Sequence, residues 1–196
     1  LEDYNMIGEG RDGGDNGEYS AIYYKSEKLR LEKAETFWLS ETPDIPSIGW
    51  DAALNRIATL GVFRIKNSNE NLIVYNSHFD HIGTQARVKS VSVILNHIKD
   101  NDFINNAIIV MGDFNAEPHD VPIKLLAENL EDSFNSFPVE KPFGTFSGFD
   151  LESKLLNRID YIFTKNIEVI EYRHIQKRLP NKLWPSDHLP IFISIN

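Results

Sequence analysis

The sequence predicts an α/β sandwich with mixed β-sheets, because strand-like and helix-like segments alternate only partly along its 196 residues. Pairs of adjacent strands are common: residues 56–65 and 71–79 are two apolar runs joined by a polar turn. Residues 106–112 form a continuous apolar run, which is typical of a strand covered on both faces. Together these features favour mixed sheets over a purely parallel, doubly wound fold.

Two segments have the pattern of helices. The apolar residues within 87–100 recur at helical spacing, and in 120–130 Asp120 is the expected N-cap, with a proline in the first turn. The remaining predicted strands are residues 19–25, 158–166, 167–175 and 189–195, and the predicted loops are residues 8–19 and 43–50.

Composition limits the classes of protein to consider. With 41% hydrophobic and 25% charged residues, the chain suits one globular domain, residues 1–196, and no apolar run approaches the length of a membrane span. The absence of cysteine excludes disulfides, thiolate metal sites and a cysteine nucleophile. The net charge of -9 argues against a protein that coats nucleic acid, but it allows an enzyme that engages one phosphate locally. The absence of cysteine does not decide between cytoplasm and export.

Polar side chains collect at four predicted strand ends. Taken singly, each is typical of an ordinary turn or a surface histidine. Taken together, they predict a crevice at one sheet edge, which is where α/β proteins place ligands. The residues are Asn76, His78, Asp80 and His81 at the first end, Asp113 and Asn115 at the second, Asp160 at the third, and Asp187 and His188 at the fourth.

These side chains suit one kind of chemistry. The oxygen atoms of the aspartates and of Asn115 are hard ligands that favour Mg²⁺ or Mn²⁺ over zinc. His78 and His188 can donate to phosphate oxygens or move protons near neutral pH. The sequence has neither a nucleophile elbow nor a Walker phosphate loop. We therefore expect a metal-assisted attack of water on a phosphate ester.

A basic stretch, residues 172–184, precedes the fourth strand end and has two interpretations. It is either a solvated loop or a rim that attracts phosphate, with a tryptophan as a flat apolar surface. The candidate substrate-binding residues in it are Lys177, Arg178, Lys182 and Trp184.

Four motifs occur in a fixed order: "NSHFDH" (76–81), "GDFNAEP" (112–118), "NRIDYIF" (157–163) and "SDHLPI" (186–191). In order and spacing they resemble the endonuclease/exonuclease/phosphatase superfamily, and the resemblance covers essentially the whole chain. It implies a four-layered α/β sandwich of two mixed sheets flanked by helices, and a metal-dependent phosphoesterase. The substrate class stays open among nucleic acids, inositol phosphates, phospholipid head groups and sugar phosphates, and so does the oligomeric state.

The resemblance also implies roles for individual residues. His188 matches the catalytic imidazole and Asp160 the acid that orients it. Asp113 matches the residue that positions or deprotonates the attacking water, with Asn115 beside it. Asp187 matches a metal ligand, and Asp113 and Asn115 are the further candidates for the ion.

A second group of residues is implied around the scissile phosphate. His78 matches a histidine that binds this phosphate in deoxyribonuclease-like members, and Glu18 matches the acid that supports it. Asn76 is expected to support the same strand end. Arg56 falls where related chains place a residue on the substrate side.

The sequence departs from the family in one respect. Members begin with a strand ending in Asn, a helix, and a strand ending in Gln-Glu, whose Glu is the main metal ligand, and neither motif occurs here. We therefore expect an N-terminally incomplete domain with a weakened metal site. The alternative function is a catalytically impaired fragment or a binding module that keeps the fold.

Overall fold

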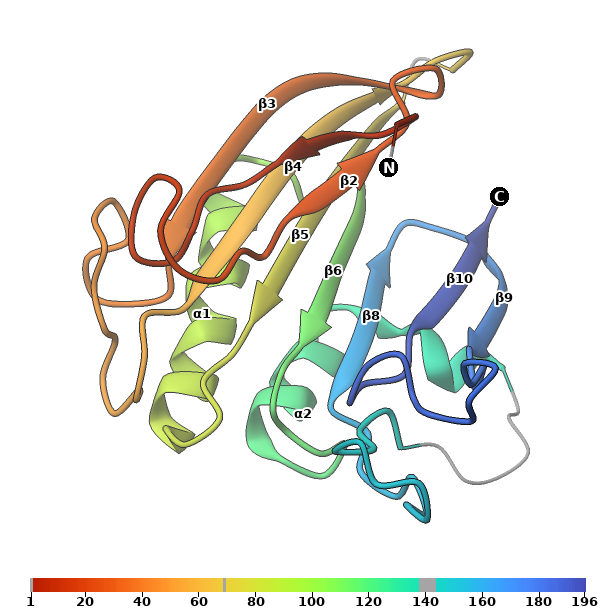
Figure 1. Ribbon diagram of the computed structural model, residues 1–196. Helices are drawn as coiled ribbons and strands as arrows, with labels where there is room; N and C mark the ends of the chain where they lie inside the picture. Colours follow the sequence, from red (N-terminus) through yellow and green to blue (C-terminus); the bar gives the residue numbers. More distant parts are fainter. Residues whose placement is uncertain (1, 69, 138–143) are drawn as a thin grey trace.

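A six-stranded mixed sheet forms the centre of the computed structural model, which describes residues 2–68, 70–137 and 144–196 (Figure 1). The strand order is β3-β4-β5-β6-β8-β7; β5 and β6 pair in parallel, and the other neighbours pair antiparallel. The strands are β3 (Leu29–Trp38), β4 (Ile57–Ile65), β5 (Asn71–His78), β6 (Ala107–Asp113), β7 (Glu131–Asp132) and β8 (Asp160–Lys165). A short 3₁₀ helix, η1 (Ser133–Ser136), follows β7.

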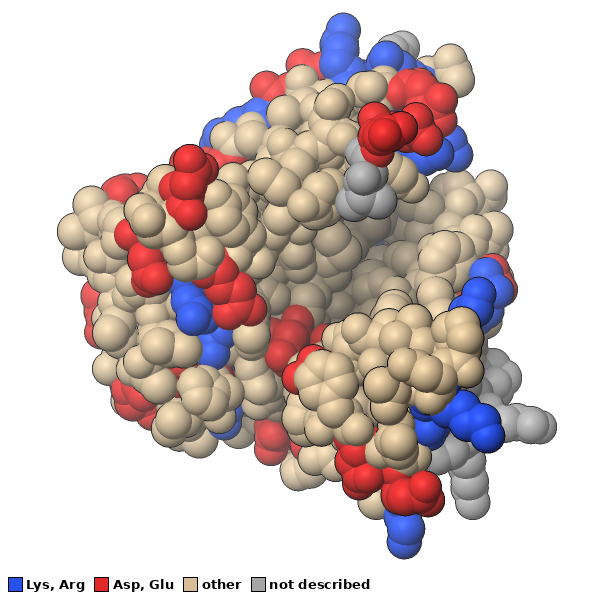
Figure 2. All heavy atoms as spheres, in the orientation of Figure 1, with Lys and Arg blue, Asp and Glu red and all other residues tan. Residues whose placement is uncertain are grey.

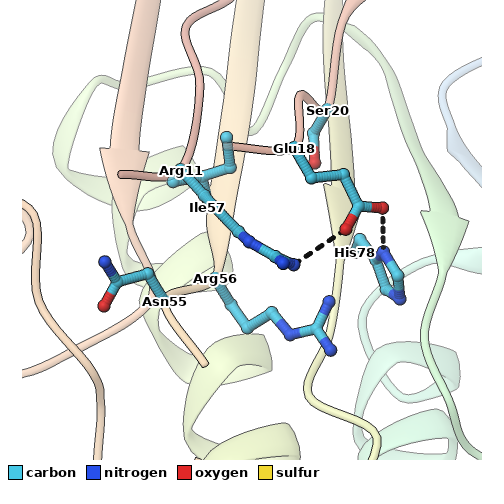
Figure 3. Close-up of a pocket in the computed structure, with 7 residues that line it drawn as sticks. All are labelled: Arg11, Glu18, Ser20, Asn55, Arg56, Ile57 and His78. Carbon is cyan, nitrogen blue, oxygen red and sulfur yellow. Dashed lines mark hydrogen bonds and ion pairs between the residues drawn. The ribbon is translucent and has the colours of Figure 1, made fainter. Parts of the chain in front are cut away.

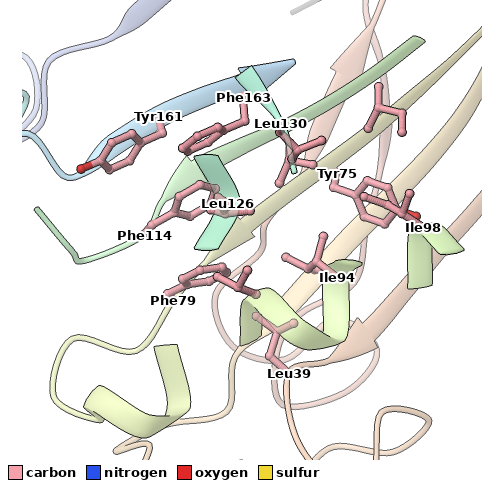
Figure 4. Packing of buried hydrophobic residues seen from close by; sticks show 14 of the residues in the cluster. Leu39, Tyr75, Phe79, Ile94, Ile98, Phe114, Leu126, Leu130, Tyr161 and Phe163 are labelled. Carbon is pink, nitrogen blue, oxygen red and sulfur yellow. The ribbon is translucent and has the colours of Figure 1, made fainter. Parts of the chain in front are cut away.

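Two α-helices cover one face of this sheet (Figure 1). α1 (Thr84–Asp100) makes the crossover between the parallel strands, and α2 (Val121–Ala127) follows β6. Alternate strand residues such as Tyr75 and Phe163 point into the core with Ile94 of α1 and Leu126 of α2 (Figure 4). Within the described part of the chain, no helix is both long and apolar enough to cross a membrane.

Both helices begin near the predicted residues, but their N-termini are capped differently. The N-cap of α1 is Gly83, which has no side chain, and the Asp51 carboxylate accepts from the amides of Gln85 and Ala86 at 3.2 and 2.6 Å. Asp120 is the N-cap of α2 as predicted, yet its side chain accepts from the preceding Glu117 amide at 2.8 Å. The first turn of α1 is thus capped by Asp51, a residue distant in sequence, and no local sequence pattern indicates such a cap.

Two small antiparallel sheets lie over the opposite face. They pair β1 (Asn5–Ile7) with β2 (Ile22–Tyr24), and β9 (Val169–His174) with β10 (Ile191–Ile195). Ile22 packs on Phe63, Leu72 and Val74, and Figure 2 shows the molecule hollowed between the two small sheets. The predicted α/β sandwich with mixed sheets is confirmed. In the described residues, α1 and α2 supply the helix layer that flanks the large sheet.

The sequence patterns missed one long strand. β3 alternates charged and less polar residues, and it forms the edge of the large sheet beside β4. Arg30 pairs with Glu32 at 2.7 Å and Lys33 with Glu35 at 2.6 Å, and a bulge interrupts the pairing between Leu31 and Lys33. Charges and bulges are common protections of an edge strand, and here they also conceal its strand pattern.

The parallel pair β5–β6 leaves no room for a side chain at Gly112. This glycine lies opposite Ser77 and has φ of 138°, and a Cβ atom there would lie 1.8 Å from the Ser77 carbonyl oxygen. A side chain would therefore push the two strands apart. The Phe79 amide then donates to the Asp113 carbonyl at 2.9 Å, which continues the pairing as far as the candidate site.

We predict that Gly112→Ala lowers the free energy of unfolding by about 3 kcal/mol, through steric overlap with β5. Gly14→Ala is the matched control: Gly14 also has positive φ (57°), but a Cβ atom added there would have no described atom within 4 Å. Its cost should be about 1 kcal/mol, from backbone strain alone. Urea denaturation with an unchanged m-value measures both, and equal losses would contradict the steric explanation.

Candidate active site

The register of the large sheet places three site residues in one row. His78 at the end of β5 lies opposite Asp113 of β6, and Asp113 lies opposite Asp160 of β8. Because alternate residues of a strand share a face, these side chains point the same way as Val74 and Met111, toward the small sheets and away from the helices. The sheet thus brings together three of the four predicted strand ends.

His188 joins the row from the loop before β10. Its Nδ1 donates to Asp160 Oδ2 at 2.8 Å, and its Nε2 lies 3.8 Å from Asp113 Oδ2. Residues 145–147 position this loop: Leu189 N donates to the Thr145 carbonyl at 2.6 Å, and the Phe146 ring packs edge-on against the imidazole at 5.0 Å. The imidazole therefore approaches the row from the side of the small sheets.

His78 is arranged in a similar way on the other side of Asp113. Its Nδ1 donates to Glu18 Oε1 at 3.0 Å, and its Nε2 lies 3.3 Å from Asp113 Oδ2. The other Glu18 oxygen accepts from Arg11 Nη1 at 2.8 Å. One carboxylate oxygen is thus flanked by two imidazole Nε2 atoms, and each imidazole is held through Nδ1 by a second acid.

Electrostatics set these groups up for proton transfer. Burial raises the pKa of Asp113, and the neighbouring Asp160 carboxylate raises it further, while His78, the Asn115 amide and His188 partly oppose the rise. The hydrogen bond to Asp160 raises the pKa of His188, against the effect of burial. Burial would raise the pKa of Glu18, but its contacts with His78 and Arg11 lower it overall. A carboxylate that gains a proton more readily than usual therefore faces an imidazole that holds its proton more firmly.

The two predicted asparagines hold backbone in place. β6 ends at Asp113, so the alternation of a strand does not extend to Asn115, which has φ of 46°. Its amide donates to Asp113 Oδ1 at 2.9 Å, and its side chain donates to the Phe79 carbonyl at 3.0 Å. Asn76 donates to the Ala21 carbonyl at 2.9 Å and ties β5 to the segment leading into β2.

A metal ion would have to use the oxygen atoms of Asp113, Asn115 and Asp187. Their donor chemistry fits Mg²⁺, which is usually held by one or two carboxylates plus several waters. Asp187 accepts from Ser186 Oγ at 3.3 Å, and its backbone carbonyl accepts from the Ser147 amide at 2.7 Å. Within the described ranges, however, no three His, Cys, Asp or Glu residues are grouped so as to hold one ion. An ion bound here would keep most of its water ligands.

Arg56 lines the same pocket as His78, and its predicted place on the substrate side stays a prediction. It is 4% exposed, its Nε contacts Asp80 Oδ2 at 3.4 Å, and its Nη2 donates to His81 Nδ1 at 3.0 Å. Figure 3 shows its guanidinium near His78 and Glu18. Sequence reasoning missed its neighbours Arg11 and Asn55. Arg11 lies seven residues before Glu18 in the glycine-rich loop, residues 8–19. This spacing is only a weak indication that the two side chains meet.

The basic stretch is arranged differently from the expected phosphate-attracting rim. Trp184 is 7% exposed, donates through Nε1 to the Asp150 carbonyl at 3.1 Å and lies under the Arg178 guanidinium at 4.2 Å. The expected flat, exposed indole is therefore wrong, because the ring is packed inside this loop region. Arg178 also donates to the carbonyls of Leu151 and Lys182, whereas Lys177 is exposed. Substrate binding by these cations stays a prediction.

The comparisons with known proteins concern the family and the fold. The sequence model of the Endonuclease/Exonuclease/phosphatase family matches residues 3–188. A curated relative, the uncharacterized protein L388 of Acanthamoeba polyphaga mimivirus, is 30% identical over 190 residues, which are 88% of this chain and 68% of that protein.

Solved structures from Bacteroides thetaiotaomicron are similar over the whole chain. An endonuclease/exonuclease/phosphatase family protein is 35% identical, with a TM-score of 0.91 over 100% of this chain and 76% of that one. A mannosyl-6-phosphatase of strain VPI-5482 is also 35% identical, with a TM-score of 0.90 over 100% of this chain and 78% of that one.

We predict that Asp160→Asn lowers the pKa of His188. The carboxylate that stabilises the imidazolium would be lost, so His188 would release its proton at lower pH than in the parent protein. NMR titration of the histidine ring protons measures this directly. Glu131→Gln is the control, because Glu131 is exposed on β7 and lies opposite Thr164, at the other end of β8 from Asp160. It should leave the His188 titration unchanged. A parent-like titration in Asp160→Asn would contradict the pairing.

Proposed function

This chain belongs to the endonuclease/exonuclease/phosphatase family, whose members hydrolyse phosphate esters, and from that premise we propose that it is a phosphoesterase with water as its nucleophile. The observation that carries the proposal is the buried Asp113 carboxylate flanked by two imidazoles, each supported by a second acid. An ordinary structural cluster has no need of two proton-transferring rings directed at one carboxylate.

The residues divide the reaction between them. Asp113 orients a water molecule and accepts its proton as the water oxygen bonds to phosphorus, which its raised pKa favours. His188, kept protonated by Asp160, donates from Nε2 to the departing ester oxygen as the phosphorus–oxygen bond breaks. His78 donates from Nε2 to a phosphoryl oxygen, where negative charge develops.

We propose Mg²⁺ or Mn²⁺ as the cofactor, held by Asp187 with Asp113 or Asn115. When bound, the ion would neutralise charge on the phosphoryl oxygens. The four acids Glu18, Asp113, Asp160 and Asp187 around the row make a cation useful, since a phosphate anion would otherwise meet several negative charges.

A binding module without turnover is the second candidate. It is favoured by the lack, among the described residues, of three acidic or imidazole side chains grouped around one ion position. A panel of phosphomonoesters and phosphodiesters, tested with Mg²⁺ and with Mn²⁺, separates the two candidates. Hydrolysis that depends on His188 supports the enzyme, and binding without product supports the module.

We predict that His188→Ala and His78→Ala each lower kcat by roughly a hundredfold or more, the usual scale for loss of a general acid or a charge-stabilising donor. His119→Ala is the matched control, because its side chain is 80% exposed and contacts Asp120 outside the row. Steady-state kinetics on the best ester of the panel measures all three. Three similar kcat values would overturn the site assignment.

We also predict that EDTA abolishes hydrolysis and that Mg²⁺ or Mn²⁺ restores it. Without the ion, the charge that builds on the phosphoryl oxygens is not neutralised. The control is a parallel assay in which EDTA is saturated with Mg²⁺ before it is added. Full activity in free EDTA would remove the ion from the mechanism while leaving the roles of the two histidines to be judged by their own variants.

A further inference from the structure

A small pocket opens beside His78, on the side away from Asp160. Its volume is about 10 Å³, room for about one water-sized atom such as a single phosphoryl oxygen, and it is bounded by three segments that are distant in sequence (Figure 3). Two arginines enter it from different segments, Arg11 from the glycine-rich loop and Arg56 from the start of β4. The complete lining is Arg11, Glu18, Ser20, Asn55, Arg56, Ile57 and His78.

Arg56 lines this pocket and carries an unsatisfied donor. Its Nη1 is buried and has no hydrogen-bond partner among the described residues, although Nε and Nη2 are engaged by Asp80 and His81. A buried donor left unpaired is unfavourable, so such a group calls for an acceptor from outside this part of the chain.

The guanidinium of Arg56 is also fixed in direction. Asp80 accepts from the amides of Ile82 and Gly83 at 2.9 and 2.7 Å, and from Leu54 N at 3.3 Å, so this carboxylate is held by backbone on several sides. Arg56 is therefore anchored through Nε to a rigid acid, while Nη1 has no partner among the described residues. Preorganised donors of this kind bind anions well, because no reorganisation is needed when the anion arrives.

Arg11 supplies a second guanidinium at the pocket. The backbone of Arg11 is held on both sides. Its amide donates to the Glu18 carbonyl at 2.9 Å, and its carbonyl accepts from Trp38 Nε1 at 2.6 Å. Its Nη1 is engaged by Glu18, and that acid is shared with His78. One carboxylate thus links Arg11 to the row of the active site.

We propose that Arg11 and Arg56 form an anion subsite that selects a terminal phosphate, and hence a phosphomonoester, as the substrate class; this rests on the proposed function. A terminal phosphate carries up to two negative charges and three non-bridging oxygens, whereas a diester carries one charge and two such oxygens. Two guanidiniums and His78 Nε2 supply donors for the extra oxygen and the extra charge.

The surroundings explain why the cations lie on this side. The row itself presents Asp113 and Asp160, and Asp187 precedes His188, so a dianion placed there is repelled from most directions. The arginine pocket places two guanidiniums next to His78, and each is shared with one acid, Arg11 with Glu18 and Arg56 with Asp80. A diester, with an alkyl group on the third oxygen, would bring a neutral ester oxygen to Arg56 Nη1.

Binding of inorganic phosphate and of dimethyl phosphate, measured by isothermal titration calorimetry in buffer containing Mg²⁺, tests this without requiring turnover. The variants are Arg11→Gln and Arg56→Lys, which retains a cation for Asp80. Arg30→Gln, at an exposed arginine on β3, is the matched control. We expect phosphate to bind more tightly than dimethyl phosphate. Each test variant should weaken phosphate binding by about tenfold, the scale of one charged hydrogen bond, and Arg30→Gln should match the parent.

The outcomes separate this inference from the proposed function. Phosphate binding that needs Arg11 and Arg56 in a chain that hydrolyses no ester supports the subsite and rejects the enzyme. Hydrolysis of monoesters and diesters at equal kcat/KM, with phosphate affinity unchanged in Arg11→Gln, rejects the subsite and keeps the enzyme. Undetectable phosphate binding by the parent also rejects the subsite. If Arg56→Lys fails to fold, as judged by circular dichroism, Arg11→Gln decides alone.

Discussion

The close approach of β5 and β6 at Gly112 is the constraint on which the site depends. A Cβ atom would overlap the Ser77 carbonyl, so only glycine permits the parallel pairing to continue to the last residues of both strands. That continuation puts Asp113 opposite His78 and, through β8, opposite Asp160. Were the strands to separate one residue earlier, the imidazole and the two carboxylates would no longer share a row.

The charges of the site follow from this placement. A buried aspartate next to another aspartate is unfavourable, and the structure compensates by directing an imidazole at Asp113 from each side. Each imidazole is held through Nδ1 by its own acid, Asp160 for His188 and Glu18 for His78. The result is an alternating series of acids and bases, Glu18, His78, Asp113, His188 and Asp160, in which every member stabilises the next.

Periodicity in the sequence could identify the elements that carry apolar patterns. The strands β4, β5, β6 and β8 and the helix α1 follow from apolar runs and helical spacing, because burial imposes those patterns. β3 could not be identified in that way, since an edge strand needs no apolar face toward solvent and protects itself with charge.

The site was predictable where strand ends meet, and not where loops fold back. His78, Asp113 and Asp160 end or begin neighbouring strands, so their meeting follows from the sheet. Arg11 reaches His78 only through the path of a glycine-rich loop, and Trp184 is buried only because the basic stretch folds onto Asp150 and Leu155. Such contacts depend on tertiary packing between loops, for which the local sequence carries no periodic signal.

Glu18 joins the sheet-built and the loop-built parts of the site. It accepts from His78 with one oxygen and from Arg11 with the other, so any anion that draws Arg11 away leaves Glu18 more fully paired with His78. A Glu18 carboxylate that is shared less with Arg11 holds His78 Nδ1 more firmly and so fixes the ring whose Nε2 is directed toward a phosphoryl oxygen. Binding of the phosphate by the loop would in this way fix the orientation of the ring that meets it. The rigid row determines where the reaction occurs, and the loop supplies the arginine and the acid that hold His78 in place.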